Sequence, residues 1–226
     1  MSMSRMNQIR MAILSIFAIA VIALLTPTHA AGQANEVTPL TRELIAAIRA
    51  GGIPAAATLV GHYVRASDGD VHMFAQDLTD LARNSDVVIR ASIDAIGPSQ
   101  LTADKTSITT DHVVTIMETF QGSLQNGTQT VVRMEGGFIR FRNNTTAEVR
   151  NSRTPKMKVG QSYILFLERT DPVQPFALAL GPQSIFTFGQ DGKTISLGRN
   201  IDPVFEKYNG MPRDQFLQTV WQAAKP

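Results

Sequence analysis

The hydrophobic pattern changes its period near Ser85, and this change constrains the fold more than any other feature of the chain. Across 87–96, apolar side chains occupy alternate positions, with Arg90, Ser92 and Asp94 between them. Alternation is typical of a strand with one buried face, because successive side chains point to opposite faces of a sheet. Further strands are expected at 107–120, 128–135, 138–142 and 176–180, with a hairpin formed by 185–188 and 194–197.

One apolar run in this region lacks the alternation. Residues 163–167 read Tyr-Ile-Leu-Phe-Leu without a polar break, and the run is too short for a helix in this setting. Such a run is typical of a strand that is buried on both faces. Residues 143–154, by contrast, are polar and are expected to form a long exposed loop.

Helical patterns precede the strands. Thr38 and Pro39 suit the cap and the first residue of a helix, and Gly51-Gly52 is expected to end it. Residues 53–66 fit either a helix or an extended chain. A second helix is expected from Asp70 to about Asn84.

A closing helix is expected at 212–224, where apolar residues share one side. The elements together predict a mainly β protein, with two N-terminal helices, a small antiparallel barrel and one C-terminal helix. We expect the chain to divide into an N-terminal helical segment at 31–84, a β-barrel at 85–200 and a C-terminal helical segment at 201–226 packed on the barrel.

Residues 1–30 have the three parts of a Sec-type signal peptide. A basic start with Arg5 and Arg10 precedes an apolar run at 11–25, and small residues lead up to Ala30. The run is shorter than the stretch of about 20 apolar residues that a spanning helix needs, and Pro27 follows it. We expect cleavage after Ala30, a secreted or periplasmic mature protein, and no other stretch long and apolar enough for a stable membrane span.

Composition narrows the possible functions. The chain has 21 Lys and Arg against 19 Asp and Glu, and two of the arginines lie in the signal, so the mature chain is formally neutral. Bulk charge therefore gives no reason to expect a nucleic acid partner. The chain has no cysteine, which excludes disulfides, a thiol nucleophile and cysteine-ligated metals. An exported protein of this kind is typical of bacteria.

Three motifs follow one another in the strand region. They are Ser85-Asp86-Val87-Val88-Ile89-Arg90-Ala91, then Met117-Glu118-Thr119-Phe120-Gln121-Gly122, then Val159-Gly160-Gln161-Ser162-Tyr163-Ile164-Leu165-Phe166-Leu167. In this order they resemble the netrin-like module, which includes the inhibitory domain of the tissue inhibitors of metalloproteinases. The resemblance covers roughly residues 84–190 and implies a barrel of the oligonucleotide/oligosaccharide-binding (OB) type.

The chain departs from that family at its inhibitory end. The family's inhibitors reach the zinc of a peptidase through an amino-terminal cysteine, and this chain has no cysteine. No inhibitory residue can therefore be carried over. The resemblance implies a cysteine-free bacterial form of the barrel, and a fold alone does not assign a function.

The most uneven charge in the mature chain lies at 133–158, which has seven basic residues and two acidic ones. Arginine can pair with phosphate or carboxylate while an aromatic ring stacks, so the stretch could bind a polyanion or a glycan. The alternative is a solvated hairpin whose charges keep an edge strand from pairing. The candidate ligand-binding residues are Arg133, Arg140, Phe141, Arg142, Lys156 and Lys158.

Metal ligands are sparse. Asp68, Asp70 and His72 form an Asp-x-Asp-x-His string that could hold a metal ion, although a turn and a helix cap would also explain both aspartates. His62 and His112 are the other histidines of the mature chain, and His112 lies on the apolar side of its strand, as a hydrogen-bonded barrel histidine would. No metal or cofactor is expected.

No catalytic motif is present either: the chain lacks a Gly-x-Ser-x-Gly elbow and a phosphate-binding glycine loop. The strand region offers several carboxylates, but their spacing selects no pair for acid–base chemistry. They are Asp94, Asp111, Glu118 and Glu168.

The leading hypothesis is therefore an exported, non-catalytic binding module whose partner is an extracytoplasmic protein or a polyanionic surface glycan. The resemblance suggests a second function, an inhibitor or accessory factor of a secreted peptidase. A third is a carboxylate-dependent hydrolase that would use Asp94, Asp111 and Glu118 in the mouth of the barrel.

Overall fold

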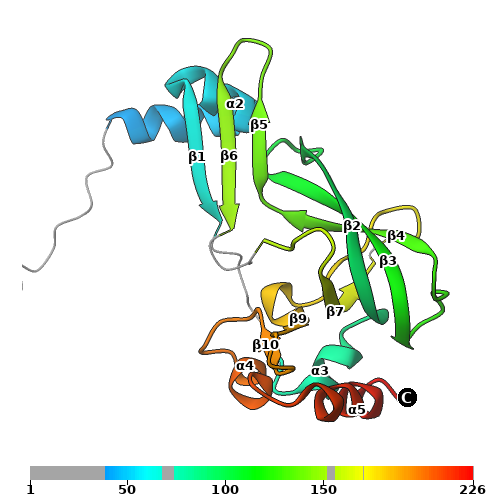
Figure 1. The fold of residues 1–226 in the computed structure, drawn as a ribbon. Coiled ribbons are helices and arrows are strands. Elements are labelled where there is room, and N and C mark those ends of the chain that lie inside the picture. The colour runs from blue at the N-terminus through cyan, green and yellow to red at the C-terminus, as the bar shows by residue number, and fades with distance from the viewer. Residues whose placement is uncertain (1–38, 68–73, 152–155, 170, 226) are drawn as a thin grey trace, which may run out of the picture. The chain divides into compact units, whose positions relative to one another are not determined.

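The computed structural model describes residues 39–67, 74–151, 156–169 and 171–225, and these residues form two β-sheets and four α-helices (Figure 1). The expected signal peptide lies outside them, and so does the string formed by Asp68, Asp70 and His72.

The larger sheet has seven strands in the order β10-β9-β7-β2-β3-β4, with β8 paired to β7. Every ladder in it is antiparallel. The mainly β, antiparallel character expected from the alternating pattern is therefore confirmed. The strands are β2 (Val87–Leu101), β3 (Ile108–Gln121), β4 (Gln129–Glu135), β7 (Ser162–Glu168), β8 (Ala177–Leu178), β9 (Ile185–Phe188) and β10 (Thr194–Ser196).

The ladders of this sheet do not close into a barrel in the described part of the chain. Beside β4, the described chain forms a single parallel bridge, between Val132 and Phe176, the residue just before β8. There, the Phe176 amide donates to the Val131 carbonyl at 3.0 Å, and the Arg133 amide donates to the Phe176 carbonyl at 2.7 Å. The gap between β4 and β7 is thus spanned by two backbone hydrogen bonds and the short strand β8.

Strand β7 is buried on both faces, as its unbroken apolar run predicts. Tyr163, Leu165 and Leu167 belong to a core inside the curve of β2, β3 and β4. Ile164 and Phe166 point the other way, into a second core. A strand between two cores has no side for polar residues, which explains the missing alternation.

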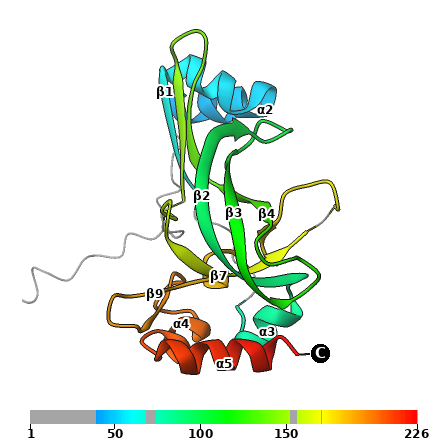
Figure 2. The same cartoon turned by 45° about the vertical axis from the view of Figure 1, so that its right-hand side comes forward.

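Three short helices cover that second core: α3 (Leu78–Arg83), α4 (Pro203–Tyr208) and α5 (Arg213–Ala223) (Figure 2). The ring of Phe216 in α5 lies 4.9 Å from that of Phe186 in β9. Helix α5 lies within the expected range of 212–224. Helix α4 was not expected, because six residues with two buried side chains give no periodic signal.

Helix α3 is shorter than the helix expected at 70–84. It begins at Leu78, since the Asp77 carboxylate accepts hydrogen bonds from the amides of Thr79 and Asp80 and so caps the helix. The start expected at Asp70 lies outside the described residues.

The longest helix, α2 (Pro39–Val60), is interrupted where the two glycines predict a stop. Gly52 adopts φ 71° and ψ −157°, but the chain then resumes a helix that contains Pro54. The amide of Ile53 donates to the Lys105 carbonyl at 2.8 Å, so the β2–β3 turn satisfies a free amide at the restart. By length and composition alone, Leu40–Val60 could cross a membrane, with a mean hydropathy of 1.4, whereas no further stretch of that length and apolarity was expected from the sequence.

The second sheet has the order β1-β6-β5 and packs against the buried side of α2 (Figure 1). Its strands are β1 (His62–Ser67), β5 (Gly137–Arg140) and β6 (Thr146–Asn151). Strand β6 corrects the expectation of a loop over 143–154. Ala147 and Val149 are buried under α2, while Glu148 between them and the flanking Thr146 and Arg150 are polar, so the strand has few apolar residues to reveal it.

Gly136-Gly137 carries the chain from β4 in one sheet to β5 in the other. Both glycines have positive φ, 115° and 143°. Three hydrogen bonds close the corner: the Phe138 amide to Ser99 Oγ at 3.2 Å, Ser99 to Thr110 at 2.9 Å, and Thr110 Oγ1 to the Gly136 carbonyl at 2.7 Å. The two sheets are therefore joined by a short polar clamp.

Replacing Gly137 by alanine is expected to destabilise the fold strongly. A Cβ at this position would overlap Ser99 Oγ and lie 2.6 Å from Thr110 Oγ1, and φ 143° is strained for any residue with a Cβ. We expect Gly137→Ala to lower the free energy of unfolding in urea by about 2–4 kcal/mol. The control is Gly127→Ala, whose φ is 80° with nothing within 4 Å; it should lose about 1–2 kcal/mol. Equal losses in the two variants would contradict the close packing at the corner.

Candidate functional site

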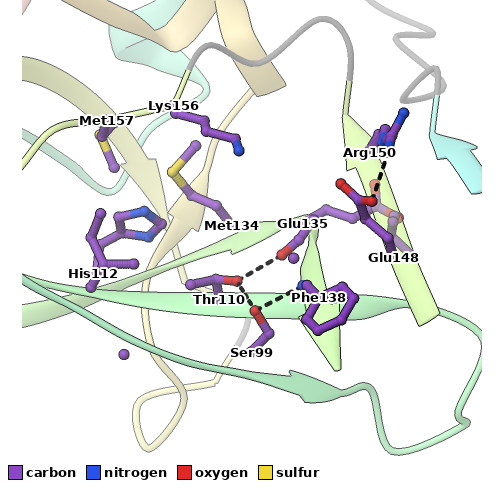
Figure 3. Close-up of a pocket in the computed structure, with 15 residues that line it drawn as sticks. Ser99, Thr110, His112, Met134, Glu135, Phe138, Glu148, Arg150, Lys156 and Met157 are labelled. Atoms are coloured by element: carbon purple, nitrogen blue, oxygen red, sulfur yellow. Dashed lines mark hydrogen bonds and ion pairs between the residues drawn. The ribbon is translucent and has the colours of Figure 1, made fainter. Parts of the chain in front are cut away.

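The corner forms the floor of a cavity of about 680 Å³ between the ends of β2, β3 and β4 and the second sheet (Figure 3). One end of the cavity is apolar and the other is charged. The residues used below to describe it are Ile96, Ser99, Thr110, His112, Met134, Glu135, Phe138, Glu148, Arg150, Lys156 and Met157.

The apolar end is built from residues far apart in the sequence. Met134 of β4 and Met157, which precedes β7, are both buried, and Figure 3 shows Met157 beside His112 of β3. Methionine side chains are flexible and polarizable, so they can adapt to ligands of different shapes. This end of the cavity suits an apolar group.

His112 is buried in this end, with 7% of its surface exposed. Its Nδ1 has no hydrogen-bond partner of good geometry. Burial lowers the pKa of His112, while the backbone carbonyls of Thr110 and Val132 and the charge of Asp111 oppose that shift. The ring is therefore held in its neutral form at neutral pH.

The charged end contains Glu148 and Arg150 of β6, whose side chains form an ion pair at 2.9 Å. Arg150 holds the pKa of Glu148 below its ordinary value, and the charges of Lys156 and His62 lower it further. Phe138, on the neighbouring strand β5, is 53% exposed and lies opposite Glu148 in the sheet register. An exposed aromatic ring thus lies beside charged groups at the mouth.

Glu135 lies at the end of β4 and is already engaged. Its Oε1 accepts hydrogen bonds from Arg65 Nη2 at 2.8 Å and from Ser107 Oγ at 2.6 Å. Lys156, by contrast, makes no ion pair or hydrogen bond through its side chain in the parts of the chain that the structure describes. Figure 3 shows Lys156 extending into the open space of the cavity.

The structure divides the candidate residues of the basic stretch. Arg133 lies opposite Asp111 on the neighbouring strand, and its Nε and Nη2 donate to the two carboxylate oxygens at 2.7 and 2.9 Å. This pairing raises the pKa of Arg133 and lowers that of Asp111. Arg133 therefore serves chiefly to form a cross-strand ion pair with Asp111.

Arg140 and Arg142 are exposed near the β5–β6 turn, and Phe141 packs against the core under α2. Strand β6, six residues long, runs away from that turn before the chain reaches Lys156, and at about 3.3 Å per residue it spans roughly 20 Å. Lys158 is exposed and is not part of the cavity lining. Of the six candidates, only Lys156 lines the cavity.

The carboxylates considered for hydrolysis are dispersed over the sheet. Asp94 accepts hydrogen bonds from Thr115 and Gln129, and Glu118 accepts from Arg90 and from the indole of Trp221. Burial and the charge of Asp86 raise the pKa of Glu168, which is exposed at the end of β7. None of these acids lines the cavity.

Metal binding finds no support in the described ranges, because they contain no group of three His, Asp or Glu side chains that could hold an ion. His62 is exposed and pairs with the Thr146 hydroxyl at 2.6 Å. The arrangement in the cavity is suited to binding through apolar contact and one cation.

Sequence reasoning did not find most of this site. Met134, Met157 and Phe138 come from three different segments, and only the register brings them together. One usable signal was present: a Gly-Gly pair that ends a strand predicts a sharp change of direction, and a cavity can form inside such a corner.

No protein-family model matches the chain, and no curated protein matches it significantly.

The burial of His112 predicts a pH dependence of stability. Its pKa in the folded protein is lower than the value of about 6.5 expected in the unfolded chain. The unfolded state therefore binds more protons as the pH falls below about 6.5, so the folded state loses stability until the pH reaches the folded pKa. We expect urea midpoints to fall between pH 7.5 and pH 5.5, and to fall less in His112→Leu. Parallel pH profiles for the two proteins would show that His112 is not held neutral.

Proposed function

We propose that the mature chain is an exported, non-catalytic binding module, and that it holds a protein or surface-glycan ligand in the cavity beside Phe138. The observation that carries this proposal is an exposed aromatic ring at the mouth of a cavity with adaptable apolar walls. Ligand sites have volumes of roughly 300–1,000 Å³, and aromatic residues are enriched among those that carry binding energy. The cavity volume of about 680 Å³ falls within that range.

The non-catalytic part of the proposal is supported by how the polar groups are used. Around the cavity, Glu148 is paired with Arg150, and Glu135 with Arg65. Among the described lining residues, no two side chains form a nucleophile–base pair of the kind that group transfer needs. A site of this composition stabilises a bound molecule without offering a route for chemistry.

We also propose that the larger sheet is an OB-like barrel of the netrin-like kind. The path β2-β3-β4 is continued by the bridge to β8, which pairs with β7, and β7 pairs back with β2. A five-stranded, partly open path of this sort is what the OB type describes. The two N-terminal helices and the C-terminal helix would then be additions to that barrel.

Export is the third part of the proposal, and processing tests it. With residues 1–30 present, we expect a bacterial host to deliver a chain that begins at Ala31 to the periplasm or the medium. Without them, the chain should stay in the cytoplasm. Cell fractionation shows the compartment of each chain, and mass spectrometry of the intact protein shows its first residue. A chain that keeps residues 1–30 after reaching the membrane fraction would contradict cleavage.

Truncation of the exposed ring tests the binding site. We expect Phe138→Ala to weaken the ligand about tenfold, since the loss of a central aromatic contact often exceeds 1 kcal/mol. Envelope proteins and glycans are captured on the wild-type chain, and the dissociation constant of each purified ligand is then measured by calorimetry. Thermal unfolding checks that the variant remains folded.

The matched control is Phe74→Ala. Phe74 is 42% exposed and lies 4.9 Å from the Arg199 guanidinium, and it is not part of the cavity lining. This variant should keep the wild-type affinity. A ligand that binds Phe138→Ala as tightly as the wild type would place the binding site elsewhere.

A further inference from the structure

The polar groups of the cavity floor have few donors left for a ligand. The Thr110 hydroxyl proton goes to the Gly136 carbonyl, so the Ser99 proton must go to Thr110 Oγ1, while Ser99 Oγ accepts from the Phe138 amide. Both hydroxyl donors are therefore used by the protein itself. A sugar has many hydroxyl groups and loses affinity when they are buried without partners. The floor disfavours a glycan.

One cationic side chain around the cavity is not balanced by a neighbouring carboxylate in the described part of the chain. Glu148 is balanced by Arg150 and Glu135 by Arg65, whereas Lys156 has no such partner among the described residues. Lys156 also lies near enough to Glu148 to lower its pKa, so two cations face one carboxylate at this end. The site therefore attracts one negative charge.

The opposite end offers apolar contact without a second charge. Met134 and Met157 are buried there, and His112 beside them is held neutral by its burial. Ile96, which also lines the cavity, adds exposed apolar surface. A ligand that fills the cavity needs an apolar group at one end and an anion at the other.

We infer that the cavity binds a polypeptide segment in which an apolar side chain lies next to a carboxylate, and that Lys156 Nζ donates to that carboxylate. The inference rests on the proposed binding function and names its ligand class. The carboxylate is that of an Asp or Glu side chain or that of a chain end, since both present the same two oxygens. The apolar side chain contacts Met134 and Met157.

An array of ten-residue peptides of random sequence tests this inference with the full exported chain. One half of the array carries free C-termini and the other half carries amidated ones. We expect the tightest binders to place an apolar residue beside Asp or Glu, or to require the free C-terminus, and the two halves identify which source supplies the carboxylate. Selection of peptides without an acidic group or a free C-terminus would overturn the inference.

Substitutions of Lys156 test its role in binding the peptide with the highest affinity. Lys156→Met keeps the length and the apolar stem but removes the charge, and we expect the dissociation constant to rise about tenfold. Lys156→Glu should shift the selected peptides from acidic to basic. Since the Lys156 side chain is exposed and makes no ion pair or hydrogen bond with the described residues, neither change should alter the thermal unfolding midpoint.

The matched control is Lys158→Met. Lys158 belongs to the same connection and is exposed. Among the described residues its hydrogen bonds are made by its backbone: the amide donates to Tyr163 Oη at 2.9 Å, and the carbonyl accepts from the Gln161 amide at 3.2 Å. It should keep the wild-type affinity. Equal losses in Lys156→Met and Lys158→Met would indicate a general charge effect and overturn the role of Lys156.

The outcomes also separate this inference from the proposed function. An oligosaccharide that displaces the best peptide, and that binds Phe138→Ala more weakly, would overturn the polypeptide ligand but keep the binding module. A cavity that binds neither peptides nor oligosaccharides would contradict both.

Discussion

The turn from β4 into β5 at Gly136-Gly137 determines how the two sheets meet. Because Gly137 has no side chain, β5 can approach the hydroxyls of Ser99 and Thr110 closely enough for them to hold the Gly136 carbonyl and the Phe138 amide. That clamp fixes the second sheet beside the ends of β2 and β3, and α2 then packs on the sheet from its other side. The cavity is the space left inside the turn, so the same contacts that join the sheets also shape the candidate site.

Strand β7 has the corresponding role in the larger sheet. It is buried between two cores, one enclosed by β2, β3 and β4 and one covered by α3, α4 and α5. A strand in that position couples the helices to the sheet, because any shift of β7 disturbs packing on both of its faces. Met157 comes before β7 in the chain and is buried in the same core as one face of that strand, so this core also holds the connection that adds Met157 and Lys156 to the cavity.

The sequence was most informative where burial alone decides the structure. The unbroken run at 163–167 and the alternation from Val87 predicted their strands, because burial on two faces or one leaves a direct mark on residue type. Strand β6 could not be predicted in this way, since only Ala147 and Val149 are buried among its described side chains and the other residues are polar. The basic stretch looked like one surface because its residues are close in sequence. Strand register separates them instead, pairing Arg133 with Asp111 and placing Arg140 at the far end of β6 from Lys156.

The basic residues of 133–158 lie in different places in the fold, so the attraction of an anion depends on Lys156 more than on the number of positive charges. Arginines at 65, 133 and 150 are bound to neighbouring carboxylates, so their charge is already balanced within the fold. Lys156 lies over a floor whose hydroxyls are occupied and beside a wall of methionines and a neutral histidine. Lys156 is the cation of this lining that has no ion-pair partner among the described residues, so it is the group left to attract an anion. The preference of this cavity for one ligand over another therefore depends on which polar side chains have no ion-pair or hydrogen-bond partner within the fold.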